Sequence, residues 1–397
     1  MESAPVNGYF DANATTPLHP AAREAWLQVA DRHWRNPSSL YPAAAAAREQ
    51  LEDARWRLAE LIGSEPESLV FTSGATESNN ALFRALADRH TAGTGGGRVW
   101  ISAIEHPAVH LPAHRNFPGR VDRLPTDSNG YLRLDLLEQR LASGPPPLLV
   151  SVMAANNETG GIQPWGEVAR LCRQAGVEFH CDASQWLGKM PAAGLHACDW
   201  LTGSGHKFGG PKGIGFLKLP DDIDWQPAFQ VGGAQQQDRR AGTEDVAGAL
   251  AMVTALEQRA GLVDDPDWRH QRAGWRDRFE QVVGDRLPGA VPLAAAALDG
   301  RLWNTSMLRL PGGRNVKWLT RLARLGFEVS TGSACSAGAG KPSLVLAAMD
   351  LPEDAMPRVL RFSSLWETEE TDWQQLADAL AAVAAELGCA PDLGPGR

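Results

Sequence analysis

Two charged residues carry the strongest chemical signal in this sequence: Lys207, in Ser204-Gly205-His206-Lys207, and Asp182, upstream in Asp182-Ala183-Ser184-Gln185. A lysine that follows an apolar stretch and lies among small residues loses hydration, which lowers its pKa and frees the amine to form a Schiff base. A cofactor that joins an aldehyde to a pyridine ring needs such an amine, and a carboxylate that keeps the ring nitrogen protonated. The alternative is a solvated lysine after a glycine-rich turn.

A phosphate site is predicted at Ser73-Gly74-Ala75-Thr76-Glu77, where an apolar run ends and a helical pattern begins. The first turn of a helix offers free N–H groups and the positive end of the helix dipole, and Gly74 lets the backbone approach a ligand closely. The alternative is an ordinary helix cap made by Ser73 with Thr76 and Glu77. The residues alone do not separate these two interpretations.

Two further polar residues follow apolar runs. His106, in Glu105-His106-Pro107, has an imidazole that can stack on a ring and shuttle protons near neutral pH. Asn156, in Asn156-Asn157-Glu158-Thr159-Gly160, can donate a hydrogen bond to a phenolic oxygen or a substrate carboxylate. The alternatives are a structural histidine and a turn rich in Asn and Gly.

Cys335 lies among small residues at 330–341, in a stretch that cannot pack a core. A thiol on such a loop can swing into a site and lose its proton there, whereas the alternative is an incidental free thiol. Cys172, Cys181 and Cys198 fall in helix or strand contexts and are predicted to be small core residues. The odd total of five cysteines, without a CxxC pair, argues against a disulfide framework and against a metal site.

Short apolar runs that alternate with helical segments must position these motifs. The predicted strands are 69–72, 98–102, 148–153, 177–181, 200–202 and 215–219, and the predicted helices are 48–61, 77–88 and 165–175. Strands separated by helices imply crossover connections and a mostly parallel sheet. Because open α/β sheets bind ligands at the carboxyl ends of their strands, we expect the motifs to meet at one edge.

The character of the chain changes after about residue 257, where a helix at 268–283 and strands at 304–310 and 328–330 are predicted. A chain of 397 residues is long enough for two domains. We therefore expect an α/β protein with a large domain at 16–257. A smaller α+β domain would comprise 1–15 and 258–397 and carry the Cys335 loop.

The composition of the chain argues against some classes of binding partner. The chain is 43% hydrophobic and carries a net charge of −9, and its arginines form no basic block, so we expect no nucleic-acid partner. The N-terminus has neither a basic nor an apolar segment typical of a signal peptide. No apolar run is long enough to span a bilayer. We expect a protein of the cytoplasm without a membrane partner.

Together the motifs resemble those of cysteine desulfurases, enzymes of the class V aminotransferase superfamily that use pyridoxal 5'-phosphate. The resemblance runs over almost the whole chain, in the family's order: Asp11-Ala12-Asn13-Ala14-Thr15-Thr16-Pro17, Asn36-Pro37-Ser38-Ser39, 73–78, 105–106, 156–158, 182–185, 204–207, 210–213, Gly242-Thr243 and 332–335. It implies the fold type I of pyridoxal-phosphate enzymes, a large domain with a mostly parallel central sheet plus a smaller α+β domain.

The resemblance also implies roles. Lys207 would bind the cofactor covalently and move the α-proton, and His106 would stack on the ring as acid or base. The predicted cofactor-binding residues are Ala75, Thr76, Asn156, Asp182, Gln185, Ser204, His206, Lys207 and Thr243. Among these, Asp182 would pair with the ring nitrogen and Gln185 with the phenolic oxygen. Asn156 and Arg361 would hold the substrate carboxylate.

The implied reaction removes sulfur from L-cysteine. The Cys335 thiolate would attack the substrate sulfur, alanine would leave, and Cys335 would carry a persulfide to an acceptor protein. Thr243 would reach the phosphate of a neighbouring subunit, which implies a homodimer. The long Cys335 loop resembles that of the iron–sulfur-cluster and nitrogen-fixation type.

Three features depart from the family pattern: Ser364-Leu365-Trp366 replaces Leu-Gly-Arg after Ser363, Trp186 replaces a small residue, and the tail does not clearly match a scaffold-docking segment. These put the usual acceptor in doubt. Another C–S lyase or a selenocysteine lyase of the same fold is an alternative that would not need Cys335. A non-catalytic scaffold with an inherited fold would instead need a degraded cofactor site.

Overall fold

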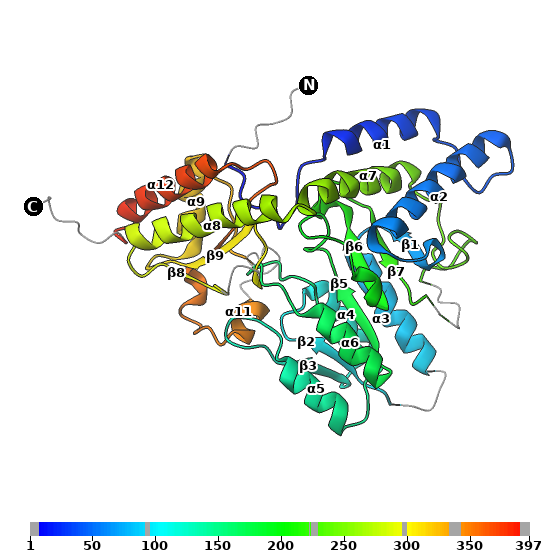
Figure 1. The fold of residues 1–397 in the computed structure, drawn as a ribbon, viewed down its shortest axis with the longest axis horizontal. Coiled ribbons are helices and arrows are strands. Elements are labelled where there is room, and N and C mark those ends of the chain that lie inside the picture. The colour runs from blue at the N-terminus through cyan, green and yellow to red at the C-terminus, as the bar shows by residue number, and fades with distance from the viewer. Residues whose placement is uncertain are drawn as a thin grey trace, which may run out of the picture.

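The computed structural model describes residues 8–91, 96–221, 223, 229–295, 300–332 and 343–389. Its larger part is built on a seven-stranded sheet in the order β1-β7-β6-β5-β4-β2-β3 (Figure 1). The strands are β1 (Leu69–Thr72), β2 (Val99–Ser102), β3 (Val121–Leu124), β4 (Leu149–Ser151), β5 (Glu178–Asp182), β6 (Trp200–Ser204) and β7 (Gly215–Lys218). The sheet is mostly parallel, and β7 alone runs against its neighbours.

Helices cover both faces of this sheet because the side chains of each strand alternate between two apolar cores. Val70 faces the core under α3 (Ala75–Thr91) and α4 (Pro107–Asn116), whereas its neighbours Leu69 and Phe71 face the other core. That second core includes α1 (Pro20–Arg32), α2 (Pro42–Ile62), α5 (Leu134–Ser143), α6 (Trp165–Ala175) and α7 (Val246–Val263). The result is a three-layer α/β arrangement.

The strand directions bring the sequence motifs to one edge. The carboxyl ends of β2, β4, β5 and β6 point the same way because these strands are parallel. Strand β1 is antiparallel to β7 and β7 is antiparallel to β6, so the carboxyl end of β1 also reaches this edge. Thr72 and Ser204, the last residues of β1 and β6, both pair with Gly215.

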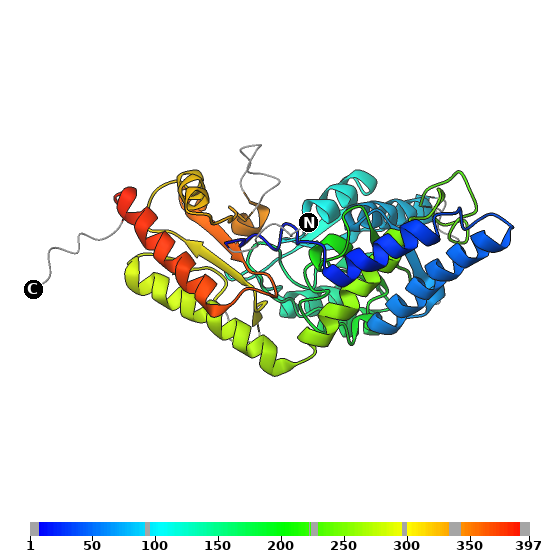
Figure 2. The same cartoon turned by 90° about the horizontal axis from the view of Figure 1, so that it is seen from above.

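A smaller antiparallel sheet in the order β10-β9-β8 forms the second lobe (Figure 2). Its strands are β8 (Val291–Pro292), β9 (Thr305–Arg309) and β10 (Val359–Ser363). Its own core includes residues of α8 (Pro266–Arg286), α9 (Asn315–Arg324) and α12 (Glu370–Glu386). A short helix, α11 (Leu344–Ala348), packs in a separate cluster near β9.

The N-terminal segment belongs to this smaller sheet by its pairing. Tyr9 bridges to Glu328 and Asp11 bridges to Ser363, although hundreds of residues separate them in the chain. The boundary expected at residue 257 falls inside α7, which continues without a break to Val263. The domain limits therefore stay a prediction.

The expected strands of the large sheet are present, with small differences at their ends, and helix 165–175 matches α6 to the residue. One expectation is wrong: 328–330 forms no strand of its own. Glu328 and Ser330 make only isolated bridges, to Tyr9 in parallel and to Arg361 antiparallel, so no ladder of consecutive pairs forms. Among the described residues, α7 is the one helix long and apolar enough to cross a bilayer, and 67% of it is buried as in a core helix.

Candidate functional site

A cavity of about 560 Å³ opens at the carboxyl edge of the large sheet. It gathers most of the predicted site residues: Ala75, Thr76, His106, Asp182, Gln185, Ser204, His206 and Lys207 all line it. They come from β1, β2, β5 and β6 and from the turns that follow these strands. The parallel strand order therefore brings together residues that are more than 100 positions apart in the chain.

Lys207 ends a single helical turn, Gly205–Lys207, that follows β6. Its Nζ donates to the carbonyl oxygens of Asn13 (2.8 Å) and Ala14 (2.9 Å). The backbone of Thr16 in turn donates to the carbonyl of His206 at 3.0 Å. The Asp11–Pro17 motif thus forms a wall of the cavity and presents main-chain acceptors to the lysine.

Asp182 is the last residue of β5 and is 7% exposed. Its Oδ2 accepts from Asn79 Nδ2 at 3.1 Å, and its Oδ1 accepts from the backbone of Ser184 at 3.0 Å. Donors therefore hold both carboxylate oxygens in place, and an acid is the group that a pyridine nitrogen requires as its partner.

His106 caps the N-terminus of α4, and its Nδ1 accepts from the backbone of Ala108 at 3.1 Å. Burial lowers the pKa of His106; Asp182 raises it in part, and Lys207 lowers it further. The ring is therefore neutral at neutral pH. With Nδ1 accepting, the proton lies on Nε2.

The phosphate end combines a helix N-terminus with a tight backbone. Gly74 has φ +146°, a conformation that disfavours a side chain, and α3 starts at the next residue. The first N–H groups of a helix have no partner within the helix and can bind an anion. Glu77 accepts from the backbone of Ser73 at 2.7 Å and pairs with Arg240 at 3.0 Å, so it anchors this turn.

His206 closes the same end of the cavity. Its Nδ1 lies 3.1 Å from Thr15 Oγ1. Burial lowers the pKa of His206 to about 4, and the cations Lys207, Lys212 and Lys189 add to this effect. The imidazole is therefore a neutral hydrogen-bonding group.

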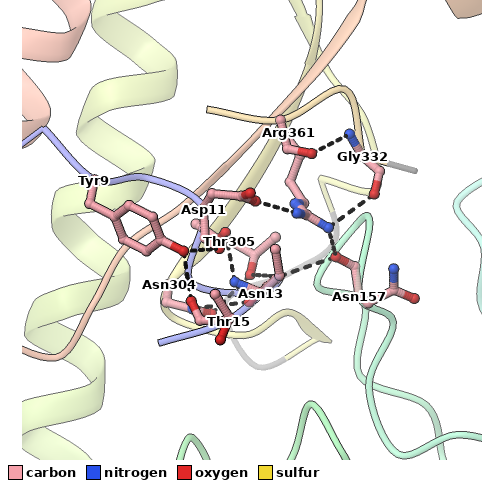
Figure 3. A network of polar contacts seen from close by, with 12 residues as sticks. Tyr9, Asp11, Asn13, Thr15, Asn157, Asn304, Thr305, Gly332 and Arg361 are labelled. Atoms are coloured by element: carbon pink, nitrogen blue, oxygen red, sulfur yellow. Dashed lines mark hydrogen bonds and ion pairs between the residues drawn. The ribbon is translucent and has the colours of Figure 1, made fainter. Parts of the chain in front are cut away.

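Arg361 and Asn156 lie behind the cavity wall and are not among the residues that line it. Arg361 donates to Asp11 Oδ1 (2.5 Å), Asn157 O (2.8 Å) and Gly332 O (3.0 Å), as Figure 3 shows. Asn156 Oδ1 accepts from the backbones of Glu158 and Thr159. Its neighbour Asn157 faces the cavity instead.

Two predicted residues stand apart from this cluster. Thr243 is exposed and does not line the cavity. Cys335 lies outside the described residues. On either side of it the description stops at Gly332 and resumes at Ser343, whose Oγ donates to Glu158 Oε2 at 2.7 Å.

Sequence reasoning missed several residues that shape the site. Asn13 O accepts from both Lys207 and Gln185 Nε2. Glu105 is fully buried, and burial followed by repulsion from Asp182 raises its pKa well above the usual value. Lys189 is fully buried next to Gln185. Only the four-residue spacing between Gln185 and Lys189 hinted that the two side chains could meet.

The fold and the site define a class: the chain belongs to the Aminotransferase class-V family, which it matches over residues 8–376. Within that class it is identified as a member of the cysteine desulfurases. A cysteine desulfurase of Cereibacter sphaeroides is 38% identical over 388 residues, with 96% of each chain covered. The structure of a NifS-like protein superposes with a TM-score of 0.85 at 27% identity, covering 96% of this chain and 100% of that one.

A second similar structure is described as SspA in complex with cysteine. It superposes with a TM-score of 0.74 at 26% identity and covers 90% of this chain and 98% of that one. The chain is thus a pyridoxal-phosphate-dependent enzyme of fold type I that acts on cysteine.

The residues present fit pyridoxal phosphate. The cavity holds an amine at Lys207, a carboxylate at Asp182 with donors on both oxygens, and a helix N-terminus beside a glycine turn. Two buried polar atoms near it, Ser184 Oγ and Asn79 Oδ1, have no hydrogen-bond partner within the described part of the chain. An amine, an acid and an anion site in one cavity match an aldehyde, a pyridine nitrogen and a phosphate.

Proposed function

We propose that this cysteine desulfurase works through Lys207, Asp182, His106 and Cys335. The observation that carries the proposal is the common cavity of Lys207, Asp182 and the N-terminus of α3. Lys207 would hold the cofactor covalently and Asp182 would keep its ring nitrogen protonated. Ala75, Thr76, Ser204 and His206 would bind the phosphate, and Gln185 would bind the phenolic oxygen.

When bound, pyridoxal phosphate withdraws electrons from the α-carbon of the substrate. Lys207, displaced by the substrate amine, would then be free to take the α-proton. Its Nζ is held toward the cavity by the carbonyls of Asn13 and Ala14. His106 is neutral with Nε2 protonated, so it can donate that proton to a leaving group and recover it later.

The substrate carboxylate would bind to Arg361, with Asn156 supporting the turn behind it. Arg361 already pairs with Asp11, so the substrate would have to share the guanidinium or replace one of its carbonyl contacts. A guanidinium presents a fork of donors that suits a carboxylate. Asn157, which faces the cavity beside Arg361, offers an additional amide.

Sulfur transfer would take place at Cys335. Its thiolate would attack the sulfur of L-cysteine, so that a sulfur–sulfur bond forms while the carbon–sulfur bond breaks. The carbon would keep the bonding pair, take up a proton and leave as alanine. Cys335 would hold the persulfide until an acceptor protein in the cytoplasm removes it.

The variant Cys335→Ala tests this assignment. We expect it to bind the cofactor as the parent does and to lose alanine formation from cysteine by about 1,000-fold or more, because the nucleophile is absent. Cys172→Ala is the matched control, since burial raises the pKa of the Cys172 thiol to about 12. Peptide masses after incubation with cysteine should show one added sulfur on Cys335. Undiminished alanine formation by Cys335→Ala would exclude the mechanism.

We also propose that the enzyme is a homodimer in which Thr243 reaches the phosphate of the other subunit. The exposed position of Thr243 away from its own cavity supports this arrangement. Light scattering is expected to give the mass of two chains. Thr243→Ala should then weaken cofactor binding without changing that mass. A monomer with full activity would contradict the proposal.

A further inference from the structure

Lys189 is a charged residue in a place where charge is unfavourable. Its side chain is fully buried in the turns that follow β5. Within the described part of the chain, no carboxylate lies in salt-bridge contact with it. Burial lowers the pKa of Lys189 well below its usual value, and the cations Lys207 and Arg361 lower it further. Burying such an amine costs free energy of folding, which points to a role for Lys189 in the site.

Within the described residues, the side chain of Lys189 makes a short and specific polar contact. Lys189 Nζ lies 2.5 Å from Gln185 Oε1. In this contact the amine donates and the oxygen of the Gln185 amide accepts, so that oxygen faces Lys189. The amide nitrogen then faces the opposite way, where it donates to Asn13 O at 2.9 Å. Lys189 thereby fixes which end of this amide is presented to the cavity.

Gln185 lines the cavity, and its amide nitrogen shares the acceptor Asn13 O with Lys207. That nitrogen carries two hydrogens, so it has a second one beyond the bond to Asn13. Without Lys189 the amide could rotate and present its oxygen instead. An oxygen would repel a phenolate, whereas an N–H group stabilises it.

Three tryptophans hold the turn that carries Lys189. The indole N–H groups donate to consecutive parts of this turn: Trp366 to Gly188 O (2.7 Å), Trp303 to Lys189 O (2.8 Å) and Trp186 to Pro191 O (2.8 Å). The rings of Trp303 and Trp366 lie 6.1 Å apart. Trp303 and Trp366 come from segments beyond α8 and pack in a core of the large sheet, so distant parts of the chain clamp this turn.

The clamp gives a physical role to two of the departures from the family pattern. Trp186 and Trp366 replace residues that are smaller or charged in the family pattern, and here each closes one end of the turn around Lys189. Large aromatic rings exclude water, and an amine that is shielded from water makes a stronger hydrogen bond than a solvated amine. Arg259 stacks over Trp366 at 4.0 Å and closes the outer side.

We propose that Lys189 is a positioning residue that orients the Gln185 amide so that its N–H₂ end faces the phenolic oxygen of the cofactor. The inference rests on the proposed function, because it needs Gln185 at that oxygen. The charged and titratable groups that act with Lys189 are Lys207, Arg361 and His206.

The consequence is a shift in the titration of the cofactor-loaded enzyme. An N–H donor to the phenolate disfavours a protonated imine at Lys207, so it lowers the pKa of that imine. In Lys189→Met this donor is no longer held in place. The pH at which the visible absorption of the bound cofactor changes should therefore rise by about one unit, the size expected for one hydrogen bond.

A second readout separates positioning from structural support. Methionine fills similar space without a charge, so the cofactor-free Lys189→Met protein should unfold at the same or a higher denaturant concentration than the parent. In a Gln185→Met background, Lys189→Met should cause no further shift of the absorption titration, because the amide it orients is gone. An equal shift in both backgrounds would show that Lys189 acts directly through its charge and would overturn the proposal.

If Lys189→Met has the absorption titration of the parent but a lower stability, Lys189 only supports the fold and the proposal is wrong. If Lys189→Met does not fold, Trp303→Phe provides the test, since it removes the indole donor to Lys189 O and should shift the titration in the same direction by less. An unchanged titration in that variant would reject the inference. Borohydride reduction of the parent, which fixes the cofactor to its lysine, distinguishes the two proposals. If Lys207 carries no cofactor label, the proposed function is wrong. If Lys207 carries the label but the variants titrate like the parent, only this inference is wrong.

Discussion

The two ends of the cofactor cavity hold charge in opposite ways. At the phosphate end, Glu77 and Arg240 form a partly exposed ion pair, with 24% and 20% of their side chains accessible. Behind Gln185, in a region that we call the far end, Lys189 is fully buried beside the amide, and the indole of Trp303 donates to its carbonyl oxygen. The phosphate end relies on an ion pair near water, whereas the far end relies on basic side chains kept from water.

This difference in exposure determines what the charges at each end can contribute to stability and to the chemistry of the site. A partly exposed ion pair adds little stability and is screened by salt, so it serves mainly to shape the turn that precedes α3. A buried cation acts strongly on its neighbours because the surroundings screen it poorly. We therefore expect substitutions at the far end to change the chemistry of the site and substitutions at the phosphate end to change affinity.

The largest loss of stability is expected at the buried far end, from Arg361→Met. This substitution removes donors from Asp11, Asn157 and Gly332 and leaves Asp11 without its cation. Breaking a buried ion pair from one side commonly reduces the free energy of unfolding by 3–5 kcal/mol, and we expect about 3 kcal/mol because Asp11 is partly exposed. Urea unfolding of the cofactor-free protein measures it.

An arginine at the surface provides the control for this loss. Arg278 pairs with Glu370 at 2.7 Å while 56% of its side chain is exposed. Arg278→Met should change the free energy of unfolding by less than about 1 kcal/mol. Equal effects of Arg361→Met and Arg278→Met would mean that burial does not distinguish the two regions.

The same contrast explains what the sequence could predict. The phosphate end could be predicted because Ser73, Gly74 and Ala75 follow a strand and lead into a helix, a local pattern that favours anion binding. Lys207 and Asp182 could be predicted because Asp182 ends β5 and Lys207 lies in the turn just after β6, at the carboxyl edge of the sheet. The strand order, with β7 antiparallel between β1 and β6, was not predicted.

The far end was hidden because its contacts join distant parts of the chain. Trp303 and Trp366 lie 114 and 178 residues from their acceptors, and no local pattern encodes such pairing. Both indoles come from segments beyond α8 but pack in a core of the large sheet, so the environment of Lys189 exists only after these segments have packed there. The abundance of tryptophan, 14 residues, was visible in the sequence, but its position was not.

The smallest effect is expected at the phosphate end, from Arg240→Gln. Burial raises the pKa of Glu77, but hydrogen bonds from Arg240 and Ser73 together bring it below the usual value. A depressed pKa stabilises the folded state above the unfolded pKa of about 4.3, and this contribution disappears as the pH falls through the folded pKa. Arg240→Gln should therefore lower the free energy of unfolding by at most about 1 kcal/mol at pH 7 and by nothing measurable below about pH 3.

Urea unfolding at both pH values measures this difference, and Arg240→Gln combined with Glu77→Gln is the reference without a titrating partner. Measured against Glu77→Gln alone, the double variant should show the same loss at both pH values, since neither protein has a carboxyl group at position 77. A loss by Arg240→Gln that persists unchanged in acid would mean that Arg240 supports the fold through contacts other than Glu77. The two ends of the cavity would then differ in exposure but not in how their charges are used.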